Sequence, residues 1–314
     1  MLAIHSNFMS KRFDRAVDGI LLLDKPPGMS SNAALQRARG FFRALKAGHA
    51  GSLDPLATGM LPLCFGQATK VCGYLLNSRK TYRVAALLGV KTDSADAEGA
   101  VIERREVPAF DTAQATAVLD SFLGAQQQVP PMYSALKHEG RRLYELARSG
   151  ETIERAPRDI FIEHITLLGC TVTSIEFEVR CSKGTYVRSL VEDIAARLGT
   201  VGHVTLLRRT QVDPFDAARM VTLDSLDSRS MEQLDALLQP ADAALAEMPV
   251  LSLDAARSVE LFHGKPLTGL TAAAGLLRAY GPADGAEQRF LGIVQADGQG
   301  RVVAERLFTP SVGA

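Results

Sequence analysis

The sequence has little cysteine and no long apolar segment. Its 314 residues include four cysteines, and none of them has the spacing of a zinc-binding or redox motif. We therefore expect reduced, unpaired thiols, as is typical of cytosolic proteins. No apolar run reaches the ~18 residues that a membrane helix requires, and residues 1–17 lack the apolar centre of a secretory signal. These absences predict a cytoplasmic protein without a membrane partner.

The short motifs of several enzyme classes are also missing. The chain contains no GxGxxG, P-loop, GxSxG or HExxH pattern, which argues against the chemistries that those motifs support. Asp93, Asp96 and Glu98 form a carboxylate cluster, but the cluster lacks the EF-hand pattern. We interpret it as a solvated turn whose side chains support local hydrogen bonds. No cofactor and no metal are expected.

The formal net charge is zero, but the charges are unevenly distributed along the chain. Residues 1–80 contain eleven Lys/Arg and four Asp/Glu, and residues 183–209 contain five and two. Residues 210–250 reverse the balance, with two basic and eight acidic side chains. A neutral chain with this asymmetry can present a basic face to a polyanion, although ordinary solvated charge explains the counts equally well.

Hydrophobic periodicity predicts a mixture of strands and helices. The hydrophobic content of 46% suffices for a full core, and the length fits a large domain with a smaller one. The patterns predict strands at 19–23, 82–88 and 175–181, and helices at 31–45, 112–123 and 187–198. Because these elements do not alternate regularly as βαβ units, we expect the α+β class.

Three further segments have distinctive compositions. Residues 129–158 contain several prolines and glycines with mixed charge, which predicts a loop-rich insertion. Residues 210–250 are acidic, and we expect them to be helical. From about residue 251 the chain becomes glycine-rich and β-like, with strands expected at 290–294 and 301–304. This last part is long enough for a separate small module.

The loop 48–59 is the most informative part of the sequence. It holds one acid, Asp54, between glycines and directly before Pro55. Pro55 biases Asp54 toward an extended backbone, and the glycines permit sharp turns and close approach of other chains. An acid presented in this way can act as a nucleophile or as an electrostatic stabiliser. The residue types alone favour an ordinary Asp-Pro turn.

The complete string changes that interpretation, because GSLDPLATGMLP resembles the catalytic loop of the TruB family of tRNA pseudouridine synthases. Four further segments resemble motifs of the same family and follow in the family's order: KPPGMSSN at 25–32, KTYR at 80–83, CSKGTYVRSL at 181–190 and GHVTLLRR at 202–209. Five motifs in order, within residues 19–222, are a specific signal.

The resemblance implies roles for individual residues. Asp54 would attack the target uridine, and Arg188 would bind the Asp54 carboxylate bidentately. Tyr82 would stack on the base and relay a proton. Without the motifs, each of these has an ordinary structural explanation. Further substrate contacts are implied for His49 in the space left by the flipped base, for Tyr186 and Leu207 against the uracil, and for Lys25, Lys183, Arg208 and Arg209 against phosphates.

The resemblance also implies an architecture. The expected fold is a mixed, mainly antiparallel central sheet flanked by helices, the pseudouridine synthase fold, over residues 19–249. An N-terminal arm at 1–18 precedes it, with Met9 as a candidate natural start, and a small PUA-like, RNA-binding β module at 250–314 follows. Residues 129–158 resemble the family's RNA-clamping insertion.

The implied reaction is the isomerisation of uridine to pseudouridine at position 55 in the T loop of tRNA, after the base has been flipped out. The implied partner is the T-arm stem-loop, and the enzyme is expected to act as a monomer without a guide RNA or an obligate protein partner. Assistance to tRNA folding could accompany catalysis.

Three alternatives differ from this interpretation. A non-enzymatic RNA-binding module needs the basic face but not Asp54, Tyr82 and Arg188 together. A synthase directed by a separate guide RNA shares the catalytic core but carries a fuller C-terminal part, and the short end of this chain favours the stand-alone form. A glycoside hydrolase usually needs two carboxylates, and only Asp54 has a motif around it.

Overall fold

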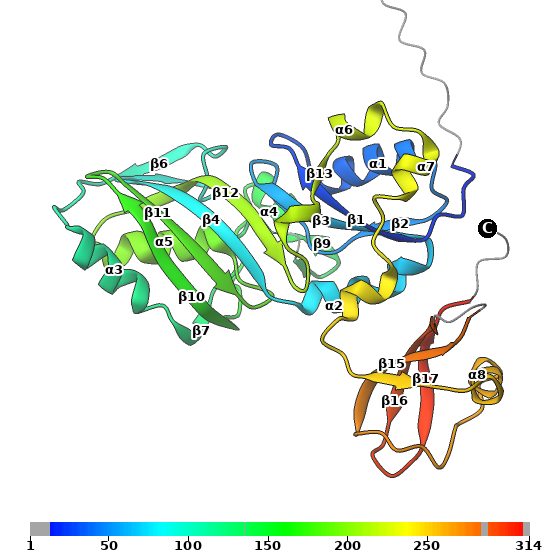
Figure 1. Cartoon of the computed structure of the whole chain (residues 1–314). Helices are drawn as coiled ribbons and strands as arrows, with labels where there is room; N and C mark the ends of the chain where they lie inside the picture. The colour runs from blue at the N-terminus through cyan, green and yellow to red at the C-terminus, as the bar shows by residue number, and fades with distance from the viewer. Residues whose placement is uncertain (1–12, 135, 284–287, 310–314) are drawn as a thin grey trace, which may run out of the picture.

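The computed structural model describes residues 13–134, 136–283 and 288–309. The candidate start at Met9 and most of the predicted N-terminal arm lie outside these ranges. No helix within them has both the length and the apolar content needed to cross a membrane. Figure 1 shows a long twisted sheet with helices packed against it and a small separate sheet below.

The central sheet has nine strands in the order β13-β1-β3-β12-β4-β11-β10-β7, with β2 paired to β3. The pairs β1–β13 and β3–β12 are parallel, and the other pairs are antiparallel. This confirms the expected mixed, mainly antiparallel sheet. Its strands are β1 (Gly19–Lys25), β2 (Ala47–His49), β3 (Thr58–Phe65), β4 (Lys80–Leu88), β7 (Gly124–Gln128), β10 (Arg158–Cys170), β11 (Ser174–Cys181), β12 (Gly202–Val212) and β13 (Val221–Thr222).

One face of the sheet carries the main apolar core. Residues of β11 alternate between buried and half-buried, as the sequence pattern predicted, and the buried set includes Phe177 and Val179. They pack in a single cluster with apolar residues of three helices, which are α1 (Ser31–Phe42), α3 (Thr112–Asp120) and α5 (Val187–Arg197). The burial of this face removes apolar surface from water and so stabilises the sheet and its helices together.

Three helical predictions differ from the structure, and the helix expected at 112–123 ends at Asp120. The helix expected at 31–45 ends at Phe42, because Arg43 adopts a left-handed conformation with φ of 52° and closes the last turn. Residues 210–250 are not mainly helical. They contain the end of β12, β13 and short segments only: η2 (Ala217–Arg219), α6 (Asp224–Asp227), α7 (Met231–Asp235) and η3 (Ala241–Leu245).

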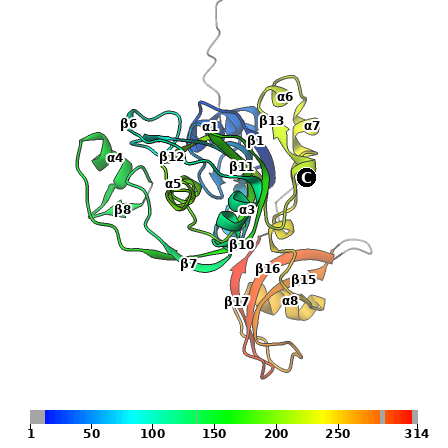
Figure 2. The same ribbon diagram turned by 90° about the vertical axis from the view of Figure 1, so that its left-hand side faces the viewer.

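Two hairpins project from the sheet. The first joins β5 (Val90–Thr92) to β6 (Val101–Arg104), and its turn carries the carboxylate cluster. The second belongs to the insertion at 129–158, where β8 (Lys137–His138) and β9 (Arg141–Arg142) precede α4 (Leu143–Arg148). Figure 2 shows the insertion as an arch that leaves the sheet at β7 and returns at β10.

The C-terminal part forms its own four-stranded sheet in the order β14-β15-β16-β17. The strands are β14 (Val250–Ser252), β15 (Gly275–Pro282), β16 (Gln288–Ala296) and β17 (Val302–Leu307), with α8 (Ala255–Phe262) beside them. Ile293 and Phe308 of this module share an apolar cluster with η1 (Gly66–Val71), α2 (Cys72–Asn77) and η3. The Lys70 ammonium also donates to the Leu307 carbonyl at 2.7 Å, so the module packs firmly on the larger part.

The parallel pairing of β3 with β12 depends on Gly59. Thr58 and Gly59 lie opposite Arg208 and Arg209, and Gly59 has a φ of 95° that disfavours other residues. A Cβ at this position would lie 2.2 Å from the Arg209 carbonyl oxygen. This close approach sets the loop that precedes β3 beside β12.

Replacing Gly59 with Ala should therefore destabilise the protein more than replacing Gly28, whose φ is 71° and whose added Cβ would meet nothing within 4 Å. Both changes carry backbone strain of about 1–2 kcal/mol. Overpacking against β12 should add about 1–3 kcal/mol for Gly59→Ala alone. Urea unfolding of the two variants measures the difference, and equal losses of stability would contradict the steric argument.

Candidate active site

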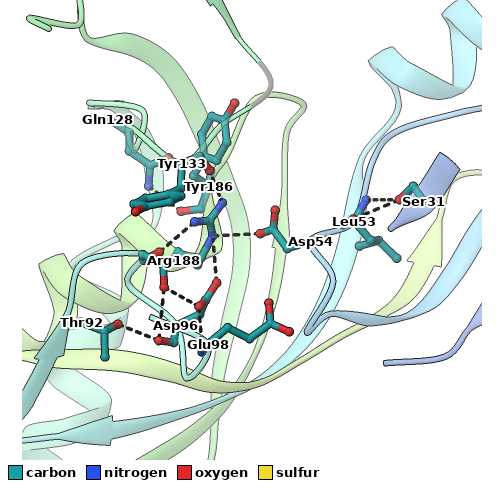
Figure 3. Close-up of polar contacts among 11 residues, drawn as sticks. Ser31, Leu53, Asp54, Thr92, Asp96, Glu98, Gln128, Tyr133, Tyr186 and Arg188 are labelled. Carbon is teal, nitrogen blue, oxygen red and sulfur yellow. Dashed lines mark hydrogen bonds and ion pairs between the residues drawn. The ribbon is translucent and has the colours of Figure 1, made fainter. Parts of the chain in front are cut away.

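The loop that carries Asp54 connects β2 to β3, and its backbone is fixed by buried side chains. The Ser31 hydroxyl at the start of α1 accepts a hydrogen bond from the Leu53 N–H at 2.7 Å and donates one to the Leu53 carbonyl at 3.0 Å. Ser31 thus holds both main-chain groups of the residue before Asp54 (Figure 3). On the other side, the Lys25 ammonium donates to the Pro55 carbonyl at 3.2 Å.

Asp54 faces the guanidinium of Arg188 (Figure 3). Arg188 Nε lies 2.9 Å from Asp54 Oδ2, and the Arg188 side chain is only 4% exposed. Its two terminal nitrogens donate to the carbonyls of Ser94, at 2.8 Å, and Tyr133, at 2.6 Å. Arg188 therefore contacts Asp54 through Nε alone. The expected bidentate contact was wrong, because the two terminal nitrogens of the guanidinium bind backbone carbonyls.

Asp96 is a second carboxylate beside Arg188. It is 4% exposed, and its Oδ2 lies 3.9 Å from Arg188 Nε. Its Oδ1 accepts hydrogen bonds from the Ser94 hydroxyl at 2.6 Å and from the Glu98 N–H at 3.1 Å. The interpretation of this cluster as a solvated turn was wrong for Asp96, which is buried against the arginine. The expected support of the turn by hydrogen bonds is confirmed.

The environment of Asp54 shifts its acidity. Desolvation by the surrounding protein raises the pKa of the Asp54 carboxyl, while Arg188 opposes the shift; Asp96 raises the pKa further and Lys25 lowers it. The Asp54 side chain is still 40% exposed, so the carboxylate lies enclosed by protein on most sides but open to solvent on one. Such a group can contact a substrate that approaches from the exposed side.

Two tyrosines and a leucine line the surroundings of the ion pair. Tyr82 on β4 lies opposite Arg209 on β12, and Leu207 lies opposite Val84, so Tyr82 and Leu207 belong to the same apolar face. Tyr186 directly precedes α5. Desolvation raises the pKa of both the Tyr82 and Tyr186 phenols, which keeps both neutral near pH 7.

His49 ends β2 and is half-buried. Desolvation lowers the pKa of its imidazole, and Arg209 lowers it further, so the ring is neutral near pH 7. Its Nδ1 is buried without a hydrogen-bond partner. A buried polar atom without a partner costs free energy.

All four basic residues expected at phosphates have protein partners, and two of them are buried. Lys25 is fully buried and donates to the carbonyls of Pro26, Met29 and Pro55, and desolvation lowers its pKa to about 8. The Arg209 guanidinium, also buried, donates to the Met60 and Gly51 carbonyls. The Arg208 guanidinium pairs with Asp24 at 2.7 Å.

The expectation was wrong for Lys25 and Arg209, because buried side chains cannot reach a phosphate. Both residues instead hold loops together through backbone carbonyls. Lys183 differs from them. It is exposed, and it donates to the Asn77 side-chain oxygen at 2.9 Å. Across the described part of the chain, no group of three or more His, Cys, Asp or Glu side chains could hold a metal ion.

Comparison with known proteins identifies the family. Residues 39–187 match the model of the TruB family pseudouridylate synthase N-terminal domain, and residues 188–246 match that of the tRNA pseudouridylate synthase B C-terminal domain. The chain is 48% identical, over 300 residues, to the tRNA pseudouridine synthase B of Burkholderia mallei (strain NCTC 10247), covering 93% of this chain and 97% of the relative. The chain belongs to the TruB family of tRNA pseudouridine synthases.

The tRNA pseudouridine synthase B of Chromohalobacter salexigens is also 48% identical to this chain. The alignment covers 95% of this chain and 96% of that relative. Among solved structures, that of a Cbf5-Nop10-Gar1 complex superposes with a TM-score of 0.71 at 24% identity, covering 96% of this chain and 87% of that one. An archaeal Nop10-Cbf5 complex gives 0.69 at 22% identity. These neighbours confirm the expected fold.

The TruB motifs did not reveal two residues at the site. The carboxylate cluster was interpreted as a solvated turn because it lacks a metal-binding pattern, and only the position of the β5–β6 hairpin beside Arg188 buries Asp96. Ser31 is not the cap of α1, because Ser30 is the cap and accepts from the Ala33 N–H at 3.1 Å. The position of Ser31 inside the motif KPPGMSSN was the available signal.

Ser31→Ala should reduce both stability and turnover of this TruB enzyme. The change leaves both main-chain groups of Leu53 buried without their partner, which costs about 1–3 kcal/mol, and it releases the segment that orients Asp54. Ser30→Ala is the matched control, because it removes only a helix cap worth about 1 kcal/mol. Thermal unfolding and single-turnover rates should separate the two variants, and equal rates would contradict a positioning role for Ser31.

Proposed function

We propose that this enzyme converts uridine to pseudouridine at position 55 in the T loop of tRNA, acting without a guide RNA or an obligate protein partner. The observation that carries the proposal is the ion pair between the partly exposed Asp54 and the buried Arg188, with Tyr82 and Tyr186 nearby. The two relatives at 48% identity, each named tRNA pseudouridine synthase B, support the choice of RNA.

The reaction requires one nucleophile and a proton exchange. The bond between uracil N1 and ribose C1′ breaks, the base turns, and a bond forms between C5 and C1′. The C5 proton is lost and N1 gains one, so no atom is consumed and no redox partner is required. Asp54 would attack either the ribose or the uracil ring, and its carboxylate is released unchanged at the end.

The ion pair keeps Asp54 available for this attack. Enclosure by protein favours the protonated acid, which is not nucleophilic, and Arg188 counteracts this by favouring the carboxylate. Because the guanidinium is fixed by the Ser94 and Tyr133 carbonyls, it also fixes the direction in which the carboxylate points. Such preorganised charge is effective because little rearrangement is needed when the reaction begins.

The neighbouring residues suit a flipped base. Tyr82 offers a ring for stacking and a neutral phenol for proton relay, and Tyr186 and Leu207 supply apolar walls. Extraction of a stacked base leaves a gap in the RNA loop. We assign His49 to that gap, since its neutral ring is only half-buried and lies at the end of β2, where the Asp54 loop begins.

Asp54→Asn should abolish turnover and leave RNA binding largely unchanged. The amide has the same shape as the carboxylate but is not a nucleophile, while contacts to phosphates dominate affinity. Tritium release from C5-labelled uridine in a T-arm stem-loop, with the purified protein alone, measures the reaction. The wild-type rate should fall as pH drops through the raised pKa of Asp54, because the protonated acid cannot attack.

Turnover by Asp54→Asn within about tenfold of wild type would contradict the nucleophile assignment. Parallel loss of RNA binding would point to a structural role for Asp54 instead. A requirement for added RNA or a protein fraction, with the wild-type enzyme, would contradict the stand-alone activity.

We further propose that the insertion at 129–158 clamps the RNA loop and that the module from residue 250 is PUA-like and contacts RNA away from the target base. The insertion places the exposed Arg141 and Arg142 on the β8–β9 hairpin. The module exposes four basic side chains, at Lys265, Arg289, Arg301 and Arg306. Exposed basic side chains are suited to phosphates, which position the RNA without reading its sequence.

Arg141→Ala should weaken binding of the T-arm stem-loop and reduce the salt dependence of that binding by about one unit of slope. Arg83→Ala is the matched control. Both arginines are exposed and paired with a glutamate, Glu151 for Arg141 and Glu176 for Arg83, but Arg83 belongs to β4 of the central sheet rather than to the insertion. Affinity measured across a salt series should change for Arg141→Ala alone, and equal slopes for both variants would contradict the clamp.

A further inference from the structure

Gln128 makes a pair of hydrogen bonds that resembles the one made by Ser31. Its side chain is buried at the end of β7. The Gln128 Oε1 accepts from the Tyr186 N–H at 2.7 Å, and Nε2 donates to the Tyr186 carbonyl at 3.1 Å (Figure 3). One buried amide therefore hydrogen-bonds both main-chain groups of the residue that directly precedes α5.

This contact replaces the usual cap of a helix. Tyr186 occupies the N-cap position of α5 but makes no side-chain hydrogen bond to the first turn. Capping groups normally fix the start of a helix by satisfying its free N–H groups. Here the start is fixed from a neighbouring strand instead, and Arg188 lies two residues further on, inside the same first turn.

The same region holds the root of the insertion. Val129, the next residue after Gln128, accepts a hydrogen bond from the Ser189 hydroxyl at 3.4 Å, and Tyr133 accepts from Arg188 at 2.6 Å. The end of β7 and the first residues of the insertion thus contact three positions around the start of α5, which are Tyr186, Arg188 and Ser189. Gln128 makes two of the four hydrogen bonds in this set, and both go to the main chain of Tyr186, so it fixes the register between the two segments.

We propose that Gln128 is a positioning residue for the reaction, which holds the first turn of α5 so that Arg188 meets Asp54 through Nε. The proposal rests on the proposed roles of Asp54 and Arg188. Gln128 does not touch the reacting atoms. It acts through the backbone of Tyr186, as Ser31 acts through the backbone of Leu53, so each member of the ion pair has a buried side chain that fixes the chain beside it.

The mechanism predicts a specific effect on pH dependence. The titratable and charged groups facing Asp54 are Arg188 from α5, Asp96 from the β5–β6 hairpin, Lys25 from the end of β1, Tyr82 from β4 and Tyr186 before α5. Of these, Arg188 favours the carboxylate most strongly. If α5 loses its register, Arg188 moves away and Asp54 holds its proton to a higher pH.

Gln128→Met tests this, because methionine has a similar length but cannot make either hydrogen bond. We expect the single-turnover rate at saturating T-arm stem-loop to fall by about 10- to 100-fold, since misplaced catalytic groups have effects of this size. The acid limb of the pH–rate profile should move to higher pH, and the dissociation constant for the stem-loop should stay within about threefold of wild type. Tritium release and a filter-binding assay provide the two readouts.

Gln127→Met is the matched control. Gln127 is the adjacent glutamine of the same strand, it is exposed, and its amide makes only a 3.4 Å contact to Asp159. This variant should keep the wild-type rate and pH profile. If Gln128→Met melts below the assay temperature, Gln128→Asn replaces it, because asparagine keeps a polar group but is one methylene too short to reach Tyr186.

A rate and an acid limb equal to those of Gln127→Met would overturn the proposal. So would a lower rate with an unmoved acid limb, because that result indicates general structural damage. Asp54→Asn in the same assay separates the two levels of inference. If Asp54→Asn is inactive and Gln128→Met is normal, only the role of Gln128 fails, whereas an active Asp54→Asn removes the proposed function itself.

Discussion

Burial of the Arg188 guanidinium is the constraint on which the rest of the site depends. A buried cation is costly unless its donors are satisfied, and α5 itself cannot supply acceptors at its own first turn. The partners come from three segments that are distant in the sequence: the Asp54 loop, the β5–β6 hairpin and the insertion. A single side chain thus ties together the nucleophile, a second carboxylate and the element proposed to hold RNA.

Other buried cations in the molecule are satisfied by backbone carbonyls. The ammonium of Lys80 donates to three carbonyls at the end of α2, which are those of Leu75, Leu76 and Ser78, and Lys25 and Arg209 do the same for the loops around Asp54. Part of the positive charge of residues 1–80 is therefore used inside the fold. A count of charges along a sequence therefore overstates the basic surface when some of the Lys and Arg side chains are buried and bind backbone carbonyls.

Sequence patterns predicted the helices and strands in which the spacing of apolar residues reflects which face is buried. The alternation in β11, the helical spacing in α5 and the apolar run in β1 all appear in the structure, because one-sided or complete burial imposes a period on the chain. The resemblance located Asp54 and Arg188, which the structure brings together. The burial of Asp96 and the grip of Gln128 on Tyr186 were not predictable, since both depend on how hairpins and strands distant in sequence pack. The prediction that residues 210–250 are helical was wrong, because composition indicates helix propensity but does not show where strands and turns interrupt the helices.

The order of strands in the sheet also determines when each strand finds its partners during synthesis on the ribosome. The apolar strand β1 is paired with β3, with β13 and, through Ile20, with Gln239, and β12 lies between β3 and β4. A ribosome adds about 5–20 residues per second, so roughly 10–40 s separate the synthesis of β3 from that of the last partner of β1. During this interval one of the most apolar strands of the protein lacks an edge partner. An unpaired apolar strand edge favours wrong pairing and aggregation until β13 has been made, and Asp54 meets Arg188 only after most of the chain has emerged.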